Sequence, residues 1–229
     1  GALYVPRSVL LSNPAAFAMM ARWRKRPNYI DDRTEVVIDG FQRSGNTFAY
    51  VAFCAAQDRD VALAHHSHAA GQVVIAARRG LPTVLTVRPP RDVVVSHAQY
   101  YPRVSMAAAL AAYIAFYRGC LGVLDRVVVA EFGHIVSDMG EVIGRLNERF
   151  DSRFRRFEHT EENVAACFER IEERAVAHHG TGILEMVVPR PSEARDARRA
   201  SLVRRYDSLP RPLRAAAQRL YDTVASTPG

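Results

Sequence analysis

The sequence predicts an α/β fold of the three-layer α/β/α kind, in which helices cover both faces of a central parallel sheet. Three observations predict it. Short runs rich in β-branched residues alternate with helical patterns from residue 35 onward, which is the order of repeated βα units. The runs are almost wholly apolar, as in strands that are buried on both faces. A P-loop-like segment, residues 40–47, joins the first run to a helical pattern, as phosphate-binding loops do.

Hydrophobic periodicity gives the order of the elements. Strands are expected at 35–40, 60–65, 82–88 and 126–131. Helices are expected at 45–57, 69–79, from 91 onward, and at 105–124, 135–149, 160–178, 193–206 and 210–225. The length of 229 residues suits a single domain, which we place at 34–229 after an N-terminal extension, 1–33. We expect the extension to be helical and to pack on the domain; the alternative is an amphipathic segment facing a lipid or a partner.

Composition bears on the ligand and on the compartment. The formal net charge is +7, a balance that favours an anionic ligand. No run approaches the roughly 20 apolar residues of a membrane span, and no signal-peptide pattern begins the sequence, so we expect a cytoplasmic protein without a transmembrane segment. The isolated cysteines Cys54, Cys120 and Cys167 are expected to be small buried hydrophobes, with neither a disulfide nor zinc.

The loop after the first strand carries the pattern Gly40-x4-Gly45-x-Thr47. This is the spacing of a P-loop, with one departure. Asn46 stands where a nucleotide triphosphatase has lysine, and the only lysine in the chain is Lys25, upstream of the strand. The loop is therefore expected to hold a phosphate-like group, but not by the usual ATP-hydrolysing chemistry.

A second segment follows the strand expected at 82–88. Arg88 ends this strand, Pro89 and Pro90 stop it, and Asp92 can open a helix from its first turn. Ser96 then lies one to two turns into that helix. Both Arg88 and Ser96 are expected to face the crevice at the carboxyl ends of the strands, where open α/β sheets bind ligands.

Together the two segments resemble the sulfotransferases that use 3′-phosphoadenosine 5′-phosphosulfate (PAPS). That family has a loop of the form Pro-Lys-Ser-Gly-Thr-Thr-Trp, matched here by Gln42-Arg43-Ser44-Gly45-Asn46-Thr47-Phe48. Its second motif, Arg-x-Pro-x-Asp-x-x-x-Ser, is matched without a gap by Arg88, Pro90, Asp92 and Ser96. The resemblance covers residues 34–150 well and the C-terminal third weakly.

The resemblance implies a role for each matched residue. Arg43 takes the place of the family's loop lysine on the leaving-group oxygen, and Ser44, Asn46 and Thr47 add side-chain donors. Phe48 takes the place of the tryptophan that stacks on adenine. Arg88 and Ser96 would hold the 3′-phosphate, over which a basic C-terminal loop closes. Arg195 is the first candidate from that loop and Arg190 the second.

Three histidines lie in the segment between the two motifs, at positions 65, 66 and 68. Sulfuryl transfer to a hydroxyl needs a base for the acceptor proton. The family places its catalytic histidine at this strand end, and His66 has the family's interval of 22 residues to Arg88. His66 is therefore the expected base, with His68 as second candidate or orienting partner because alternate strand residues share a face. A zinc cluster is the competing interpretation, but no cysteine or acid lies at ligand spacing.

The resemblance implies a sulfotransferase with PAPS as donor, adenosine 3′,5′-bisphosphate (PAP) as product and no metal. The acceptor would be a small molecule, lipid or carbohydrate with a hydroxyl or amine; no nucleic acid is expected, and a homodimer is left open. Two departures from the family are Ala64, where cytosolic members have lysine, and Ala130, where they have tyrosine. The alternatives are a P-loop nucleotide kinase-like transferase, against which the missing lysine argues, and a non-catalytic nucleotide-binding module.

Overall fold

The computed structural model of the protein describes residues 4–179 and 193–227. At its centre is a four-stranded, wholly parallel sheet with the strand order β2-β1-β3-β4. The strands are β1 (Val36–Gly40), β2 (Leu63–His65), β3 (Thr83–Val87) and β4 (Val128–Glu131). Gly40 is in register with Thr86, and Val87 with Glu131, so the carboxyl ends of the strands meet at one edge of the sheet.

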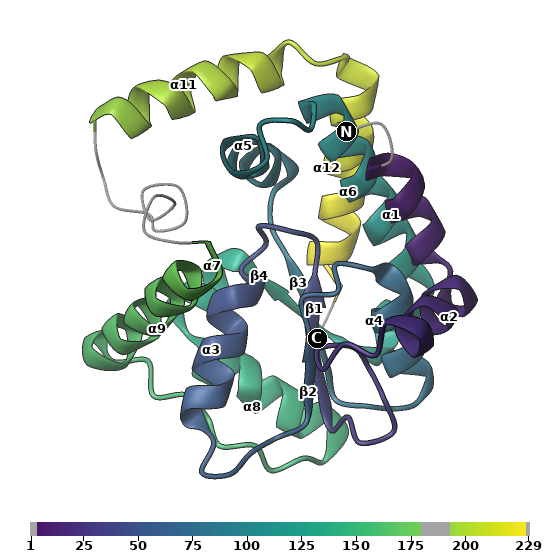
Figure 1. Ribbon diagram of the computed structural model, residues 1–229, viewed down its shortest axis with the longest axis vertical. Helices are drawn as coiled ribbons and strands as arrows, with labels where there is room; N and C mark the ends of the chain where they lie inside the picture. The colour runs from purple at the N-terminus through teal and green to yellow at the C-terminus, as the bar shows by residue number, and fades with distance from the viewer. Residues whose placement is uncertain (1–3, 180–192, 228–229) are drawn as a thin grey trace.

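Helices lie on both faces of this sheet (Figure 1), an arrangement compatible with the three expected layers. On one side are α3 (Asn46–Ala56), α7 (Phe132–Ser137), α8 (Met139–Phe150) and α9 (Glu161–His179). On the other are α1 (Tyr4–Ser12), α2 (Pro14–Arg24), α4 (Ala70–Arg78), α6 (Met106–Cys120) and α12 (Arg211–Ala225). Above the carboxyl edge lie α5 (Pro90–Tyr100) and α11 (Glu193–Asp207). The predicted α/β class with a parallel sheet is confirmed.

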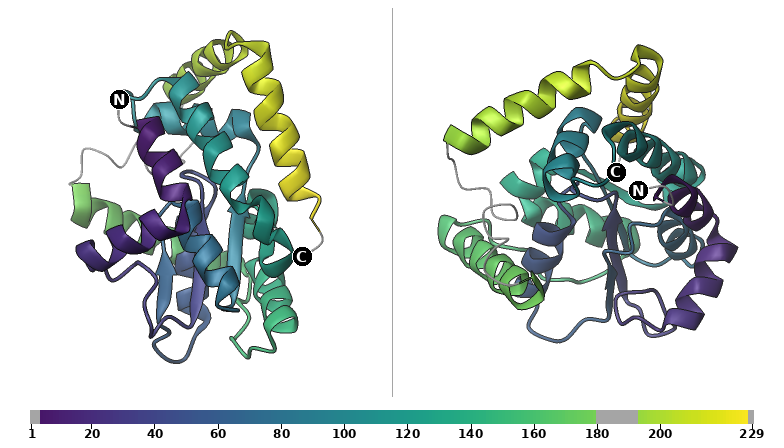
Figure 2. Two further views of the ribbon diagram at one scale, coloured as in Figure 1. Left: turned by 90° about the vertical axis from the view of Figure 1, so that its right-hand side faces the viewer. Right: turned by 45° about the horizontal axis from the view of Figure 1, so that its top comes forward.

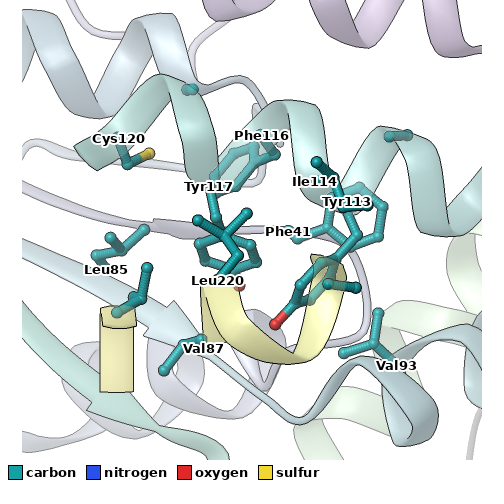
Figure 3. Packing of buried hydrophobic residues seen from close by; sticks show 14 of the residues in the cluster. Phe41, Leu85, Val87, Val93, Tyr113, Ile114, Phe116, Tyr117, Cys120 and Leu220 are labelled. Carbon is teal, nitrogen blue, oxygen red and sulfur yellow. The ribbon is translucent and has the colours of Figure 1, made fainter. Parts of the chain in front are cut away.

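Burial on both faces explains why the strand sequences are apolar. Every residue of β1 and β3 is buried. Leu85 and Val87 pack with Tyr113 and Tyr117 of α6 (Figure 3). Val84, which directly precedes Leu85 in the strand, packs on the opposite face, on the α3 side. Successive strand residues thus fill two separate cores, which fixes the register of the sheet.

The predicted element boundaries differ most from the structure in three places. The strand expected at 60–65 begins only at Leu63. The helix expected at 135–149 is divided into α7 and α8 at Asp138, whose carboxylate accepts a hydrogen bond from the Glu141 N–H at 2.9 Å and so caps a new helix. The helix expected to run to 124 ends at Cys120 and continues as a 3₁₀ turn, Leu121–Arg126.

The stretch Met106–Arg126 is long and apolar enough to cross a membrane by length and composition. The expectation that no run approaches this length was therefore too strong. Of its most apolar 18-residue window, 56% is buried inside the protein, where Tyr113 and Tyr117 are fully buried against the sheet. Its place in the core accounts for its apolar composition.

The N-terminal helices pack on the domain. Phe17 of α2 is fully buried and lies edge-on to Tyr29 at 5.5 Å between ring centroids. A side chain at Gly71 of α4 would lie 2.6 Å from the Phe17 Cβ, so the two helices approach closely. The hydroxyl of Tyr4 donates a hydrogen bond to Gln42 Oε1 at 3.0 Å, which ties the start of α1 to the loop after β1.

Candidate functional site

Two glycines fix the shape of the loop between β1 and α3. Gly45 has a φ of 96°, a left-handed conformation that residues with a Cβ adopt only with strain. Gly40 has no room for a side chain, because a Cβ there would lie 2.1 Å from Thr86 Oγ1. The backbone at Gly40 therefore lies directly against Thr86 of β3. The helix α3 begins with no side-chain cap on its first turn. Its first N–H groups are thus left for another acceptor.

Ser44 and Asn46 turn their side chains into the protein. Asn46 is 3% exposed; its amide donates to the Phe41 carbonyl at 2.9 Å, and its Oδ1 accepts from Thr86 Oγ1 at 3.0 Å. The Ser44 hydroxyl lies 3.3 Å from that of Tyr117. Asn46 therefore stabilises the loop through buried hydrogen bonds. It occupies the position where a P-loop triphosphatase carries its lysine. Both residues act on any ligand through the shape of the loop.

The two sequence motifs, about 40 residues apart, meet in the structure. Arg43 Nε donates a hydrogen bond to Ser96 Oγ at 3.0 Å. Arg88 Nη1 donates to the Arg43 carbonyl at 3.2 Å. The guanidinium of Arg43 lies 5.0 Å from the ring of Tyr100, and that of Arg88 lies 3.9 Å from the ring of Phe132. Two half-buried arginines are thus held side by side on aromatic surfaces.

Arg88 lies in an electrostatic setting suited to an anion. Burial lowers the pKa of Arg88, the carboxylate of Asp92 opposes this, and the nearby charges of Arg43 and Arg199 lower it further. An anion among these three cations would relieve their mutual repulsion.

The third cation, Arg199, comes from α11 and was not singled out from the sequence. Its Nη2 donates to Asp92 Oδ1 at 2.9 Å. Arg199 lies one helical turn after Arg195, the residue expected from the sequence. The side chain of Arg195 and the whole of Arg190 lie outside the described part of the protein. The spacing of four residues in α11 was the available signal, because residues four apart share a helix face.

Asp39 organises the histidine turn after β2. Its fully buried carboxylate accepts hydrogen bonds from the N–H groups of Ser67 and His68, at 3.1 and 3.2 Å, and from the amide of Gln72 at 2.9 Å. Burial raises the pKa of Asp39, while the charge of His68 and hydrogen bonds from the Ser67 hydroxyl and from the Gly40 and His68 N–H groups oppose the rise. His66 and His68 both have φ of 51°, and the cluster of left-handed residues that they form with Arg43 is typical of functional sites.

The structure changes the reason for pairing His66 with His68. The strand β2 ends at His65, so alternation along a strand does not apply to the two later residues. Their rings nevertheless lie 5.6 Å apart, edge to face. The turn that Asp39 holds brings them together, and this turn could not be recognised from periodicity.

His66 faces the start of α3. Its Nε2 lies 3.1 Å from Thr47 Oγ1, and its Nδ1 lies 2.6 Å from His65 Nδ1. Burial, together with His68 and His65, holds the pKa of His66 well below 6.5, so this imidazole is neutral near pH 7. His68 instead donates from Nδ1 to the Gly40 carbonyl at 2.9 Å, which leaves Nε2 as its basic nitrogen.

Phe48 lies in the core. It is 5% exposed and contacts Phe157, His159 and Phe168 at ring-centroid distances of 6.4, 6.0 and 5.6 Å. The aromatic faces next to the two arginines belong instead to Tyr100 and to Phe132 of α7, neither of which the sequence motifs indicate.

His97 is a further buried histidine, and only its place after Ser96 could have indicated it from the sequence. Its Nε2 lies 2.8 Å from the Tyr4 hydroxyl and 3.0 Å from Gln42 Oε1. Its Nδ1 has no hydrogen-bond partner among the described residues. Burial and the charge of Arg43 lower the pKa of His97 to about 4, so this residue is neutral in the folded protein near pH 7.

Within the described residues, no group of three His, Cys, Asp or Glu side chains could hold a metal ion. The cysteines are free, and Cys120 and Cys167 are buried as expected. Cys54 is exposed, because it lies on the outward side of the last turn of α3, so the expectation of three buried cysteines was wrong for this residue.

No protein-family model matches the sequence, and a search of curated proteins found no similar one.

Proposed function

We propose that the protein is a PAPS-dependent sulfotransferase that moves a sulfuryl group to a hydroxyl or amine. The observation that carries the proposal is the meeting of the two motifs at the carboxyl edge. Arg43 donates a hydrogen bond to Ser96, Arg88 donates one to the Arg43 carbonyl, and His66 lies 3.1 Å from Thr47. Anion-binding groups and a neutral imidazole thus both contact the segment 43–47, which joins β1 to α3.

In the proposed reaction, the acceptor oxygen attacks the sulfur of PAPS. The bond between sulfur and the bridging oxygen breaks, PAP leaves with its electron pair, and the acceptor proton passes to His66 Nε2. The N–H groups at the start of α3 and the guanidinium of Arg43 stabilise the charge on the departing phosphate. Arg88, Ser96 and a cation of α11, Arg199 or Arg195, would bind the 3′-phosphate.

Two histidines compete for the role of base. The position of His66 beside Thr47 favours it, because the transferring group is expected over Gly45–Thr47. The tautomer of His68 favours that residue, because its Nδ1–H is committed to the Gly40 carbonyl. Transfer should be abolished in His66→Ala with PAP binding kept, and reduced less in His68→Ala. The reverse result would assign the base to His68, and full activity of both variants would overturn the histidine mechanism.

The binding half of the proposal is tested by calorimetry without Mg²⁺. PAP should bind, and Arg88→Ala should lower the affinity for PAP by roughly 10- to 100-fold. This corresponds to the loss of a hydrogen bond to a charged group, on the order of 1.5–3 kcal/mol. Adenosine 5′-monophosphate should be affected far less.

Arg91→Ala is the matched control, since Arg91 lies three residues on but pairs with Asp207 at 3.1 Å. Equal weakening of both nucleotides would contradict the 3′-phosphate assignment. Tight Mg²⁺-dependent ATP binding would favour the kinase-like alternative, and PAP binding without transfer in any acceptor screen would favour a binding module.

A further inference from the structure

The N-terminal helices expose large apolar side chains. Val9 and Leu10 at the end of α1 are 55% and 61% exposed, and Met19 and Trp23 of α2 are 73% and 80% exposed. No other large hydrophobic residue in the described part of the chain exceeds 41%. Single exposed apolar residues are common, but four within 15 positions of one another indicate an interaction surface.

The same segment is cationic throughout. Residues 1–30 contain five basic residues and no acidic one, so they carry most of the chain's net charge of +7. All five basic side chains are exposed: Arg7, Arg22, Arg24, Lys25 and Arg26. The partner of this surface is therefore negatively charged.

The inward side of the two helices is already occupied by the protein. Phe17 and Leu11 are buried in the cluster that includes Tyr29, and α1 and α2 lie on the outside of the molecule, at its right-hand edge in Figure 1 and in the right-hand view of Figure 2. Met19 and Trp23 are four residues apart and so share one face of α2. This face points away from the domain and is the one to be covered.

We propose that α1 and α2 dock on the surface of an anionic lipid bilayer. A nucleic acid would satisfy the cations but leave Leu10, Met19 and Trp23 in water, and an acidic protein would need an apolar patch of its own to cover them. A bilayer interface satisfies both, because its headgroups bind arginine and lysine while the acyl boundary receives apolar side chains and tryptophan. At 11 residues, α2 is too short to span a bilayer and would lie in its plane.

Trp23 makes the proposal directly testable, because it is the only tryptophan in the chain. Vesicles of phosphatidylcholine mixed with phosphatidylglycerol should shift the fluorescence emission of Trp23 to the blue and protect it from quenching by aqueous iodide. Vesicles of phosphatidylcholine alone, at the same lipid concentration, should neither shift the emission nor protect it. Added salt should reverse the binding, since surface charges are screened.

The variants separate charge from apolar contact. The triple variant Arg22→Gln, Arg24→Gln, Arg26→Gln should bind the anionic vesicles roughly 100-fold more weakly, at about 1 kcal/mol for each cation near a charged membrane. The double variant Leu10→Ser, Met19→Ser keeps Trp23 and should also lose binding. The matched controls, Arg204→Gln with Arg205→Gln and Leu121→Ser, change exposed residues elsewhere and should bind as the unaltered protein does.

Three results would overturn the proposal. One is the absence of a blue shift with anionic vesicles. Another is an equal shift with soluble polyglutamate or duplex DNA, which would assign the surface to an acidic macromolecule. The third is a shift that grows with protein concentration in the absence of lipid, which would assign it to a second copy of the chain.

Discussion

The carboxyl edge of the sheet and the N-terminal helices depart from the usual pattern of burial in opposite directions. At the edge, polar side chains are inside: Asp39, Ser44 and Asn46 are 3% exposed or less. On α1 and α2, apolar side chains are outside, up to the 80% exposure of Trp23. The first region is held by hydrogen bonds with fixed partners, whereas the second has an outward face without a partner in the described structure.

Different measurements report on the two regions. Buried polar groups must be satisfied, so their partners can be read off the structure and tested through stability. Exposed apolar groups contribute little to stability, so only a binding measurement reports on them.

Asp39→Ala should give a large loss of stability. It removes the acceptor of the Ser67 and His68 N–H groups and of the Gln72 amide, and it leaves buried donors unsatisfied. We expect the free energy of unfolding to fall by about 3–5 kcal/mol, as for a buried pair broken on one side. Urea unfolding followed by circular dichroism measures it. Asp32→Ala is the control, since that side chain is fully exposed, and a similar loss there would refute the special role of Asp39.

Acid should weaken the fold through His97. Its pKa is about 4 in the folded protein and about 6.5 when unfolded, so the unfolded chain binds more protons between these values. The stability is therefore present above pH 6.5 and falls as the pH drops toward 4, by up to about 1.4 kcal/mol per pH unit for one histidine. His97→Gln should flatten this dependence of the urea midpoint, and an unchanged slope would show that other groups cause it.

Gly45→Ala should cost about 1–2 kcal/mol, because a Cβ at φ 96° is strained and would lie 3.1 Å from Phe132. Gly122→Ala is the control, since nothing lies within 4 Å of a Cβ there. Thermal unfolding of both variants measures the difference. If the midpoints of thermal unfolding of the two variants fall by the same amount, the left-handed conformation of Gly45 does not contribute to the stability of the loop.

Met19→Ser should change the free energy of unfolding least, by no more than about 0.5 kcal/mol, as for most surface substitutions. Phe17→Ala, two residues earlier and fully buried, should cost about 3–5 kcal/mol. Urea midpoints of the two variants sharpen the comparison within a single helix. A large loss in Met19→Ser would mean that its exposed face is packed against something in solution.

The strands could be predicted from the sequence because burial on both faces of a parallel sheet leaves short runs dominated by β-branched and apolar residues, as in β1 and β3. The inward turn of Ser44 and Asn46 could not, since the direction of a loop side chain depends on backbone angles such as the φ of 68° at Arg43. The pairing of His66 with His68 was expected from strand alternation, but the turn held by Asp39 produces it. The approach of Arg199 to Asp92 depends on how α11 crosses α5, which no local pattern contains.

The left-handed residue that ends α2 has a practical consequence. Lys25, whose N–H closes the helix on the Ala21 carbonyl, is exposed and is the only lysine in the sequence. A lysine-specific protease therefore has a single peptide bond to cleave, and it lies between the two N-terminal helices and the rest of the protein. The severed fragment would stay in place only through noncovalent contacts such as those of Phe17 and Tyr4. Whether it co-elutes with the remaining chain thus measures how firmly the outermost helices are held.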